Sequence, residues 1–509
     1  MKQIKNVAAA LCLTGTLAQA QDTSTEPLSA IEWLSRSVET ASIFEPPVSG
    51  NAEAPTVTVT ALGGLSKDPI GLLPADVTGL PSTIWSASDE AVLVDLVRAE
   101  RIDTVPALQE FLKVLMLAEA DPPAGAGADG ALFLARVDKL LDLGALEAAQ
   151  SLIEQAEPDT PPLFRRWFDV ALLTGTEDDA CVAMRDTPSI APTYPARIFC
   201  LARNGDWSAA ALTLNTHRVL GDIDAQEEAL LSRFLDPELY EGEPALDPPA
   251  RVSPLTFRMH EAIGEPLITS NLPLAFSHAD LRVTTAWKSQ LEAAERLARH
   301  DAVSENVLLK FYTARTPAAS GGIWDRAEAI QRFDVAMTAR DPVGVSRTLP
   351  AAWSAMQQAR AEVQFAKLYG PALQELPLFG PAALIAFEVG LLSPEYESVA
   401  IEAAETGAAF DPFLIAIARG TPQDMPANTP RALAIQSAFD SNPPPQELQT
   451  LVDSGKLGEA LLRAIALFDA GAEGDLRSVT DALSLLRSVG LEDVARRAAL
   501  QLMLLDRAA

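Results

Sequence analysis

The spacing of apolar residues predicts helices over most of the chain. Between residues 28 and 41, apolar side chains recur three and four positions apart, which places them on one helical face. Ser88, Asp89 and Glu90 stand directly before another apolar run, and a capping residue followed by acids is typical of a helix start. The next helix is expected from about 105 to 118. The pattern therefore predicts an all-α protein.

An exception lies between residues 46 and 81. Residues 56–60 read Thr-Val-Thr-Val-Thr, and this strict alternation is typical of a strand. Gly63 and Gly64 follow and supply a turn. We expect a short extended or β-hairpin segment within residues 21–87. The alternative interpretation is a poorly ordered linker.

Proline and glycine divide the helical part into many short elements, since the chain contains 37 prolines. Breaks are expected at 121–130, 236–254, 421–429 and 441–445. The predicted organisation is an export signal at 1–20, an N-terminal helix with an extended arm at 21–87, helical repeats at 88–240, a central helical region at 241–420 and C-terminal helical repeats at 421–509.

A glycine followed five positions later by an alanine recurs in the helical part. The pairs are Gly144/Ala149, Gly175/Ala180, Gly205/Ala210, Gly455/Ala460 and Gly490/Ala495. Glycine adopts the left-handed backbone that ends a helix, and a small alanine lets the next helix approach closely. The predicted unit is therefore a helical hairpin that recurs about every 30 to 35 residues.

At these residues the chain resembles tetratricopeptide repeats, whose unit is a helical hairpin of about 34 residues. Pro161 and Pro192 follow Ala149 and Ala180 at the place where that family often ends its second helix. The family's aromatic positions in the first helix are mostly missing, and residues 215–450 contain no clear copy. The resemblance implies an α-solenoid of helical hairpins.

The first twenty residues have the pattern of a cleavable export signal. Lys2 and Lys5 precede an apolar stretch at 7–17, and Ala18 and Ala20 are the small residues that signal peptidase requires. We expect cleavage after Ala20 and a periplasmic protein, with full secretion as the alternative. The apolar stretch is about half of the roughly 20 residues that a membrane-spanning helix needs, so no transmembrane anchor is expected.

The charge restricts the partners. The formal net charge is −30 and becomes −32 when Lys2 and Lys5 leave with the signal. Such a surface repels nucleic acid and anionic lipid, so we expect neither as a partner. Hydrophobic residues make up 48% of the chain, which is enough for a large core. The expected partner is a protein of the cell envelope.

Two cysteines, Cys181 and Cys200, remain after cleavage, and an oxidising compartment favours a disulfide between them. In the repeat, Cys181 begins the second helix of one hairpin and Cys200 ends the first helix of the next. Neighbouring helices of such a stack are antiparallel, so these two ends should meet. No metal or other cofactor is expected, because the four histidines lack ligand spacing. They are His217, His260, His278 and His300.

Glu397-Ser398, followed by the stretch from Gly420 to Pro426, resembles soluble lytic transglycosylases. In that family a glutamic acid before a serine is the general acid/base, and a Gly-Leu-Met-Gln stretch lines the sugar groove. Here Thr421-Pro422 replaces Leu-Met. The alternative interpretation of Glu397 is a solvated helix residue, and we assign no catalytic residue.

A second candidate combines aromatic and charged residues around a Gly-Gly turn. It consists of Tyr312, Arg315, Trp324, Asp325 and Arg326. Aromatic and arginine side chains are favoured in protein interfaces, which makes this a candidate interaction surface. The alternative is that the aromatic rings pack the loop onto helices while the arginines pair with acids.

The chain contains no nucleophile elbow, phosphate loop, zinc-protease helix or calcium loop. The predicted function is therefore a non-catalytic periplasmic scaffold or adaptor that mediates protein–protein interaction in the cell envelope. One alternative is a peptidoglycan-active enzyme that uses Glu397. The other is a ligand-binding receptor with an enclosed aromatic pocket within 255–420.

Overall fold

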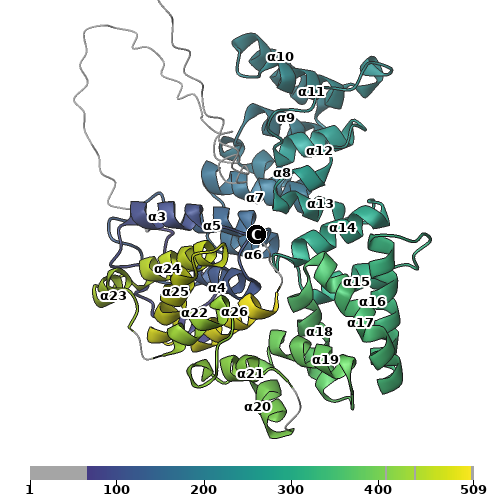
Figure 1. Ribbon diagram of the computed structural model, residues 1–509. Coiled ribbons are helices and arrows are strands. Elements are labelled where there is room, and N and C mark those ends of the chain that lie inside the picture. Colours follow the sequence, from purple (N-terminus) through teal and green to yellow (C-terminus); the bar gives the residue numbers. More distant parts are fainter. Residues whose placement is uncertain (1–65, 407–409, 441–442, 506–509) are drawn as a thin grey trace, which may run out of the picture.

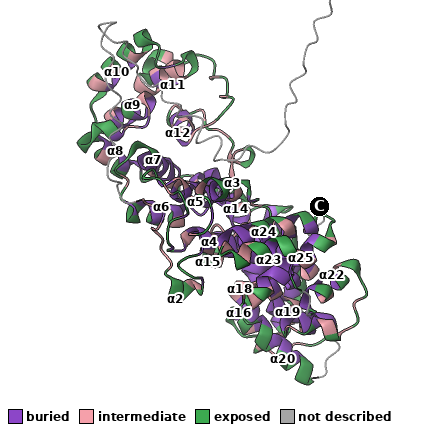
Figure 2. Ribbon diagram, turned by 90° about the vertical axis from the view of Figure 1, so that its left-hand side faces the viewer, coloured by how far each residue is buried: buried purple, intermediate pink, exposed green. Residues whose placement is uncertain are grey.

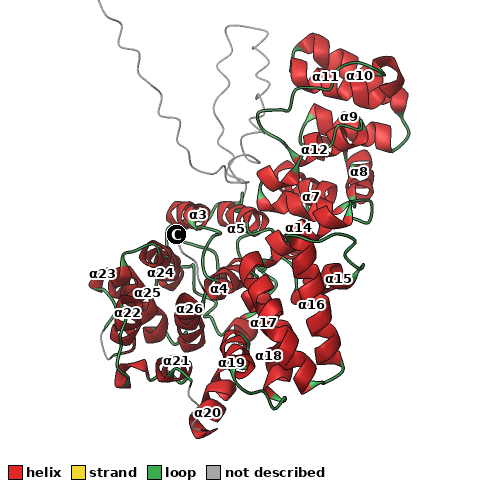
Figure 3. Ribbon diagram, turned by 45° about the vertical axis from the view of Figure 1, so that its right-hand side comes forward, coloured by secondary structure: helices red, strands yellow, loops and turns green. Residues whose placement is uncertain are grey.

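The computed structural model describes residues 66–406, 410–440 and 443–505 (Figure 1). Within these ranges every regular element is a helix, and the only β-type pairs are two isolated bridges, Leu73 with Ala118 and Asp89 with Ala124 (Figure 3). The prediction of an all-α protein is confirmed for this part of the chain.

The predicted strand at 56–60 and its glycine turn lie outside the described residues. The following stretch, 66–87, contains the short helix α2 (Ala75–Thr78) and turns, without a hairpin. Its end is packed firmly, since Ile84 and Trp85 are 1% and 0% exposed. A Cβ added to Gly458 would lie 2.3 Å from the Trp85 ring, so only glycine admits this ring against the helix. The described part of the predicted arm is thus a packed loop.

The helices form two lobes and an arm, which we define by their elements. The terminal lobe contains α3 (Glu90–Ala99), α4 (Pro106–Leu117), α5 (Ala131–Asp142), α6 (Leu146–Gln155), α20 (Tyr396–Thr406), α21 (Pro412–Ala418), α22 (Pro430–Phe439), α23 (Gln446–Asp453), α24 (Leu457–Ala472), α25 (Leu476–Ser488) and α26 (Glu492–Leu504). The arm contains α7 (Pro161–Thr174), α8 (Glu177–Asp186), α9 (Tyr194–Arg203), α10 (Trp207–Leu220), α11 (Ala225–Leu235) and α12 (Pro254–Ala262). After the short α13 (Ser277–Asp280), the middle lobe contains α14 (Trp287–Ala298), α15 (Glu305–Thr313), α16 (Ile323–Thr338), α17 (Pro342–Ala359), α18 (Glu362–Gln374) and α19 (Pro381–Leu392).

The glycine and alanine pairs do what their spacing predicts. All five glycines have a left-handed backbone, with φ of 69° at Gly144, 87° at Gly175, 85° at Gly205, 75° at Gly455 and 88° at Gly490. All five alanines are 0% exposed. The helices on either side of each pair pack on one another, namely α5 on α6, α7 on α8, α9 on α10, α23 on α24 and α25 on α26. The predicted helical hairpins are confirmed at these five places.

The two ends of the described chain lie together, so that the purple and yellow segments are neighbours in Figure 1. Helix α24 packs on α3, and α26 packs on α4. Gln501 Oε1 accepts a hydrogen bond from the Ala107 backbone N–H at 2.7 Å, and Arg497 Nη2 donates to Glu110 at 2.7 Å. Units of an open solenoid contact only their neighbours in sequence, whereas these contacts join the two ends of the described chain.

A cluster of charges joins the terminal lobe to the middle lobe. Asp301, in the loop after α14, pairs with Lys113 of α4 and with Lys367 of α18, and Gln364 Nε2 donates to it at 2.8 Å. Burial alone would raise the pKa of Asp301, but Lys113 and Lys367 outweigh burial and lower the pKa to about 2. The carboxylate is therefore a charged link between lobes.

The arm extends away from the two lobes and has its own apolar core (Figures 1 and 2). Its base is α7, which packs on α6, α12 and α13, and its tip is formed by α10 and α11. The tip is the least buried part of the arm, as the colours of Figure 2 show. Across the described ranges, no helix combines the length and apolar character needed to cross a bilayer.

Candidate interaction surface

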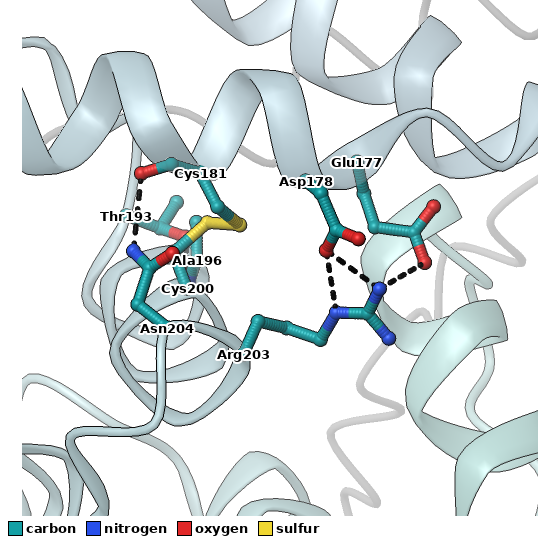
Figure 4. The surroundings of a disulfide bond; sticks show 8 residues. All are labelled: Glu177, Asp178, Cys181, Thr193, Ala196, Cys200, Arg203 and Asn204. Carbon is teal, nitrogen blue, oxygen red and sulfur yellow. Dashed lines mark hydrogen bonds and ion pairs between the residues drawn. A yellow bond between two sulfur atoms is a disulfide. The ribbon is translucent and has the colours of Figure 1, made fainter.

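The structure brings the two predicted cysteines to disulfide distance in the arm (Figure 4). Cys181 of α8 and Cys200 of α9 have Cα atoms 4.9 Å apart and an S–S separation of 1.98 Å. Asn204 Nδ2 donates to the Cys181 carbonyl at 3.3 Å, and Arg203 Nη2 donates to Asp178 at 2.6 Å. Helices α8 and α9 are therefore joined by a covalent bond with a hydrogen bond and an ion pair beside it.

Tyr312 and Arg326, two residues of the predicted interaction surface, converge on a buried carboxylate inside the middle lobe. Tyr312 is 1% exposed and its hydroxyl donates to Glu295 at 2.7 Å. Arg326 donates to both oxygens of Glu295, at 2.9 and 2.7 Å. Burial and then the charge of Glu295 raise the pKa of Tyr312 well above its ordinary value. These contacts match the alternative interpretation, in which the aromatic ring packs and the arginine pairs with an acid.

The other three residues of this predicted surface are spread around the same loop. Trp324 is partly buried, and its ring centroid lies 5.1 Å from that of Trp287. Arg315 and Asp325 are exposed. The structure therefore leaves only these two of the five predicted residues fully open to a partner.

Glu397 stands in the first turn of α20, with 56% of its side chain exposed. Its Oε1 lies 3.4 Å from Arg496 Nη1. Gly420 also approaches this arginine, since an added Cβ would lie 2.6 Å from it. A catalytic acid usually sits in a water-poor pocket that raises its pKa. The exposure and the arginine partner of Glu397 instead match the solvated helix residue that we gave as the alternative.

The region 255–420 does contain an aromatic-lined cavity, between α15, α16, α17 and α18. Tyr312, Phe365 and Tyr369 line it, and its volume is about 10 Å³. This is room for about one water molecule, which is too small for the ligand pocket of a receptor. Elsewhere in the described ranges, no three His, Cys, Asp or Glu side chains are grouped as metal ligands.

Helix α10 at the tip of the arm presents apolar side chains on its outer side. Ala210 and Leu214 are the two buried residues of this fully described helix, and they belong to the core of the arm. Three large apolar residues point the other way, and we call them the α10 surface. They are Leu212, Val219 and Leu220, with exposed fractions of 68%, 81% and 66%.

The helical positions of these residues bring them together. Leu212 and Val219 are seven residues apart, which is close to two full turns, and Leu220 is eight residues from Leu212. All three side chains therefore lie on one side of α10. An exposed apolar cluster of this kind usually marks an interaction site.

Helix α10 contributes no negative charge, a property that it shares with α9, α17, α21 and α22. The chain carries 69 acidic residues, but this helix contains none. Its ionisable side chains, His217 and Arg218, are both paired within the arm. His217 Nδ1 lies 2.8 Å from Asp222, and Arg218 Nη1 donates to Glu228 at 3.2 Å. Helix α10 itself therefore adds no electrostatic repulsion toward an acidic partner.

The sequence contains the signal for this surface, although it was not used in predicting a site. The stretch 207–220 has no acid and is rich in apolar residues on both sides of the helix. Such a helix is expected to be buried on all sides. Only the structure shows that nothing in the described chain covers one of its sides.

The fold and the site define an all-α protein of helical hairpins with an apolar surface at the tip of an arm. A scan against protein-family models found no matching family, and searches of curated proteins and of solved structures found no match.

Proposed function

We propose that this chain is an exported, non-catalytic scaffold that binds a protein partner in the cell envelope through the α10 surface. The observation that carries the proposal is the exposed, acid-free outer side of α10. The compartment is the periplasm, with secretion as the alternative, because residues 1–20 have the pattern of a cleavable signal. These twenty residues lie outside the described part of the structure.

The size of the α10 surface supports specific binding. About two-thirds or more of the surface of Leu212, Val219 and Leu220 is exposed, so covering each residue would contribute roughly 1 to 2 kcal/mol to the free energy of binding. A single helix that offers apolar residues at such spacing commonly lies in an apolar groove of its partner. The partner is therefore expected to provide an apolar groove that receives one side of α10.

The helical hairpins support the scaffold class. Five glycine-ended hairpins fit the resemblance to tetratricopeptide repeats, which implies an α-solenoid and a binding role. The solenoid arrangement itself is part of the proposal, since the two ends of the described chain also pack together. The arm is the portion in which successive hairpins extend outward and leave a helix uncovered.

The test is crosslinking in the periplasm of the host, followed by reconstitution with the purified partner. The variant carries Leu212→Glu and Val219→Glu, which place two charges on the α10 surface. The control is Val335→Glu on α16, because Val335 is 68% exposed, as is Leu212, but lies in the middle lobe. We expect a discrete crosslinked partner with the native chain and with the control, and at least a tenfold loss with the double variant.

With the purified partner, the native chain and the Val335→Glu control should bind with similar affinity, and the double variant should bind at least tenfold more weakly. Equal crosslinking by the double variant and the control would contradict the α10 surface as the binding site. Crosslinks only between copies of this chain would contradict a separate partner.

A further inference from the structure

The arm encloses a cavity that the scaffold function does not use. The cavity lies between α7, α9, α11 and α12, and the segment 241–253 covers it. Its volume is about 270 Å³, just below the range of roughly 300 to 1,000 Å³ for drug-sized ligands, which leaves room for a ligand about the size of one amino acid.

Hydrogen bonds hold the covering segment in place. The Leu246 backbone N–H donates to Glu265 at 2.9 Å, and Gln226 Nε2 donates to the Asp247 carbonyl at 3.2 Å. Arg233 adds an ion pair to Glu265 at 2.9 Å. The cavity is therefore a built feature with a fixed cover, rather than a gap under a loose loop.

Two polar side chains in the wall have buried atoms without hydrogen bonds. Asp169 is 8% exposed, and its Oδ2 has no hydrogen-bond partner among the described residues; the nearest cation, Arg165 Nε, is 3.7 Å away. His260 is 3% exposed, and its Nδ1 has no hydrogen-bond partner within the described chain; the nearest carboxylate oxygen, Glu265 Oε2, is 4.0 Å away. Buried polar atoms in folded proteins nearly always have a partner, so these two indicate a bound polar group or water.

The protonation states of these groups define what they attract. Burial raises the pKa of Asp169 to about 6, against the opposing charges of Arg165 and Arg166. The carboxyl group is thus mostly ionised at pH 7 and accepts hydrogen bonds. Burial lowers the pKa of His260, so its ring is neutral at pH 7. Asp169 Oδ2 can therefore accept a hydrogen bond from a ligand group with N–H donors, beside Arg165, which lines the same wall.

The mouth and the remaining wall have different chemistry. Arg251, in the covering segment, is exposed, lines the cavity and forms no ion pair with any residue that the structure describes. Phe168, Leu230 and Met259 supply buried apolar surface, at 1%, 3% and 2% exposure. The cavity thus offers the Asp169 carboxylate, the exposed Arg251 guanidinium and an apolar wall. It is also lined by Arg165, which lies beside Asp169, and by the acids Asp224, Glu227 and Asp247.

We propose that this cavity binds a free amino acid with an apolar side chain, in its zwitterionic form. The α-ammonium group pairs with Asp169, the α-carboxylate pairs with Arg251, and the side chain packs against Phe168, Leu230 and Met259. A simple amine would leave Arg251 without a partner, and a fatty acid would bring a second negative charge toward Asp169. This ligand is independent of the protein partner proposed for the α10 surface.

The experiment is calorimetric titration of the full mature chain with L-leucine and two analogues of equal size. Leucinamide lacks the carboxylate, and 4-methylpentanoate lacks the amine. We expect leucine to bind at least tenfold more tightly than either analogue, because each analogue leaves one charge of the site unpaired.

Two variants assign the contacts. Arg251→Gln should weaken leucine binding about fivefold or more. It should leave leucinamide binding unchanged, because leucinamide has no carboxylate that could pair with Arg251. Asp169→Asn should weaken leucine binding at least tenfold but should not weaken 4-methylpentanoate binding, since that ligand has no amine and gains from the loss of a like charge. Arg197→Gln is the control, because Arg197 is an exposed arginine of α9 outside the cavity lining.

Three results would overturn the proposal. They are no binding of L-leucine, L-valine or L-phenylalanine at millimolar concentration, leucinamide binding as tightly as leucine, and equal effects of Arg251→Gln and Arg197→Gln. If circular dichroism shows that Asp169→Asn is unfolded, the exposed Arg251 and the analogue series still decide the question.

Discussion

A buried glutamic acid in the terminal lobe leads to a stability prediction with an unusual sign. Glu100 follows α3, is 5% exposed, and its Oε2 has no hydrogen-bond partner within the described residues. Burial and then the nearby charge of Asp469 raise the pKa of Glu100 to about 8, although Lys139 opposes them. Burial also raises the pKa of Asp469 to about 7. At pH 7 Glu100 is therefore mostly protonated and Asp469 is about half ionised, whereas most acids are fully charged.

The free energy of unfolding should fall as pH rises past the ordinary pKa of Glu100, 4.5. Below that pH the side chain is protonated in both states and contributes nothing. Between pH 4.5 and 8 the unfolded chain ionises while the folded chain keeps its proton, so stability falls by about 1.4 kcal/mol per pH unit. The loss reaches up to about 5 kcal/mol above pH 8.

Glu100→Gln removes this cost, because glutamine has nearly the same shape and does not ionise. We expect the variant to be more stable than the native chain at pH 8.5, by up to about 5 kcal/mol, and equally stable at pH 4. Urea unfolding followed by circular dichroism at the two pH values measures the difference. Glu405→Gln, at an exposed position of α20, is the control and should have the same midpoint as the native chain at both.

The reasoning would be refuted if Glu100→Gln lowered the urea midpoint at pH 8.5. That result would mean that the folded chain holds an ionised Glu100, paired with Lys139, rather than a protonated one.

Other predictions concern the link between lobes, the arm and the hairpins. Asp301→Asn should lower the free energy of unfolding by about 2 kcal/mol above pH 4, because the folded pKa of about 2 lies below the unfolded value of 3.8. The difference from the native chain should disappear as pH falls from 4 to 2, and acid titration of both proteins checks this. Replacing Cys181 and Cys200 by serine should lower the free energy of unfolding by about 3 kcal/mol. Mass spectrometry of the unreduced native chain should find the two cysteines in one linked peptide pair, and two free thiols would contradict the bond. Gly205→Ala should lower the free energy of unfolding by about 1 kcal/mol, because its left-handed backbone disfavours any side chain. Gly144→Ala should lower it further, because the added Cβ would also lie 3.1 Å from a neighbouring side chain. Equal thermal midpoints of the two variants would contradict this.

Local pattern predicted the helical elements well, because each depends on neighbours in sequence. The helix expected from about 105 to 118 is α4, at Pro106–Leu117, and Asp89 accepts hydrogen bonds from two backbone N–H groups at the start of α3. The glycine and alanine spacing located five hairpins for the same reason, since a left-handed residue ends a helix whatever surrounds it. The disulfide pairing also needed only the antiparallel direction of successive helices.

The candidate sites were less accessible to sequence reasoning, because burial is not a local property. Tyr312 and Arg326 have the composition of an interface, but Glu295 lies 31 residues before Arg326 and turns the pair inward. Conversely, the apolar α10 looked like an ordinary core helix until the structure left Leu212 and Val219 uncovered. In both cases the deciding fact is which distant element packs beside the residue.

The joining of the two chain ends depends on such distant contacts most of all. Nothing near Glu110 indicates that its partner is Arg497, 387 positions away, or that Gln501 accepts from the backbone at Ala107. The hairpin pattern alone predicts an open array, because it indicates only that each hairpin packs on the next one in sequence. Here α26 packs on α4, and this leaves the arm as the part of the described chain that ends in an uncovered helix. The proposal that α10 binds a partner therefore rests on a feature of the closed fold.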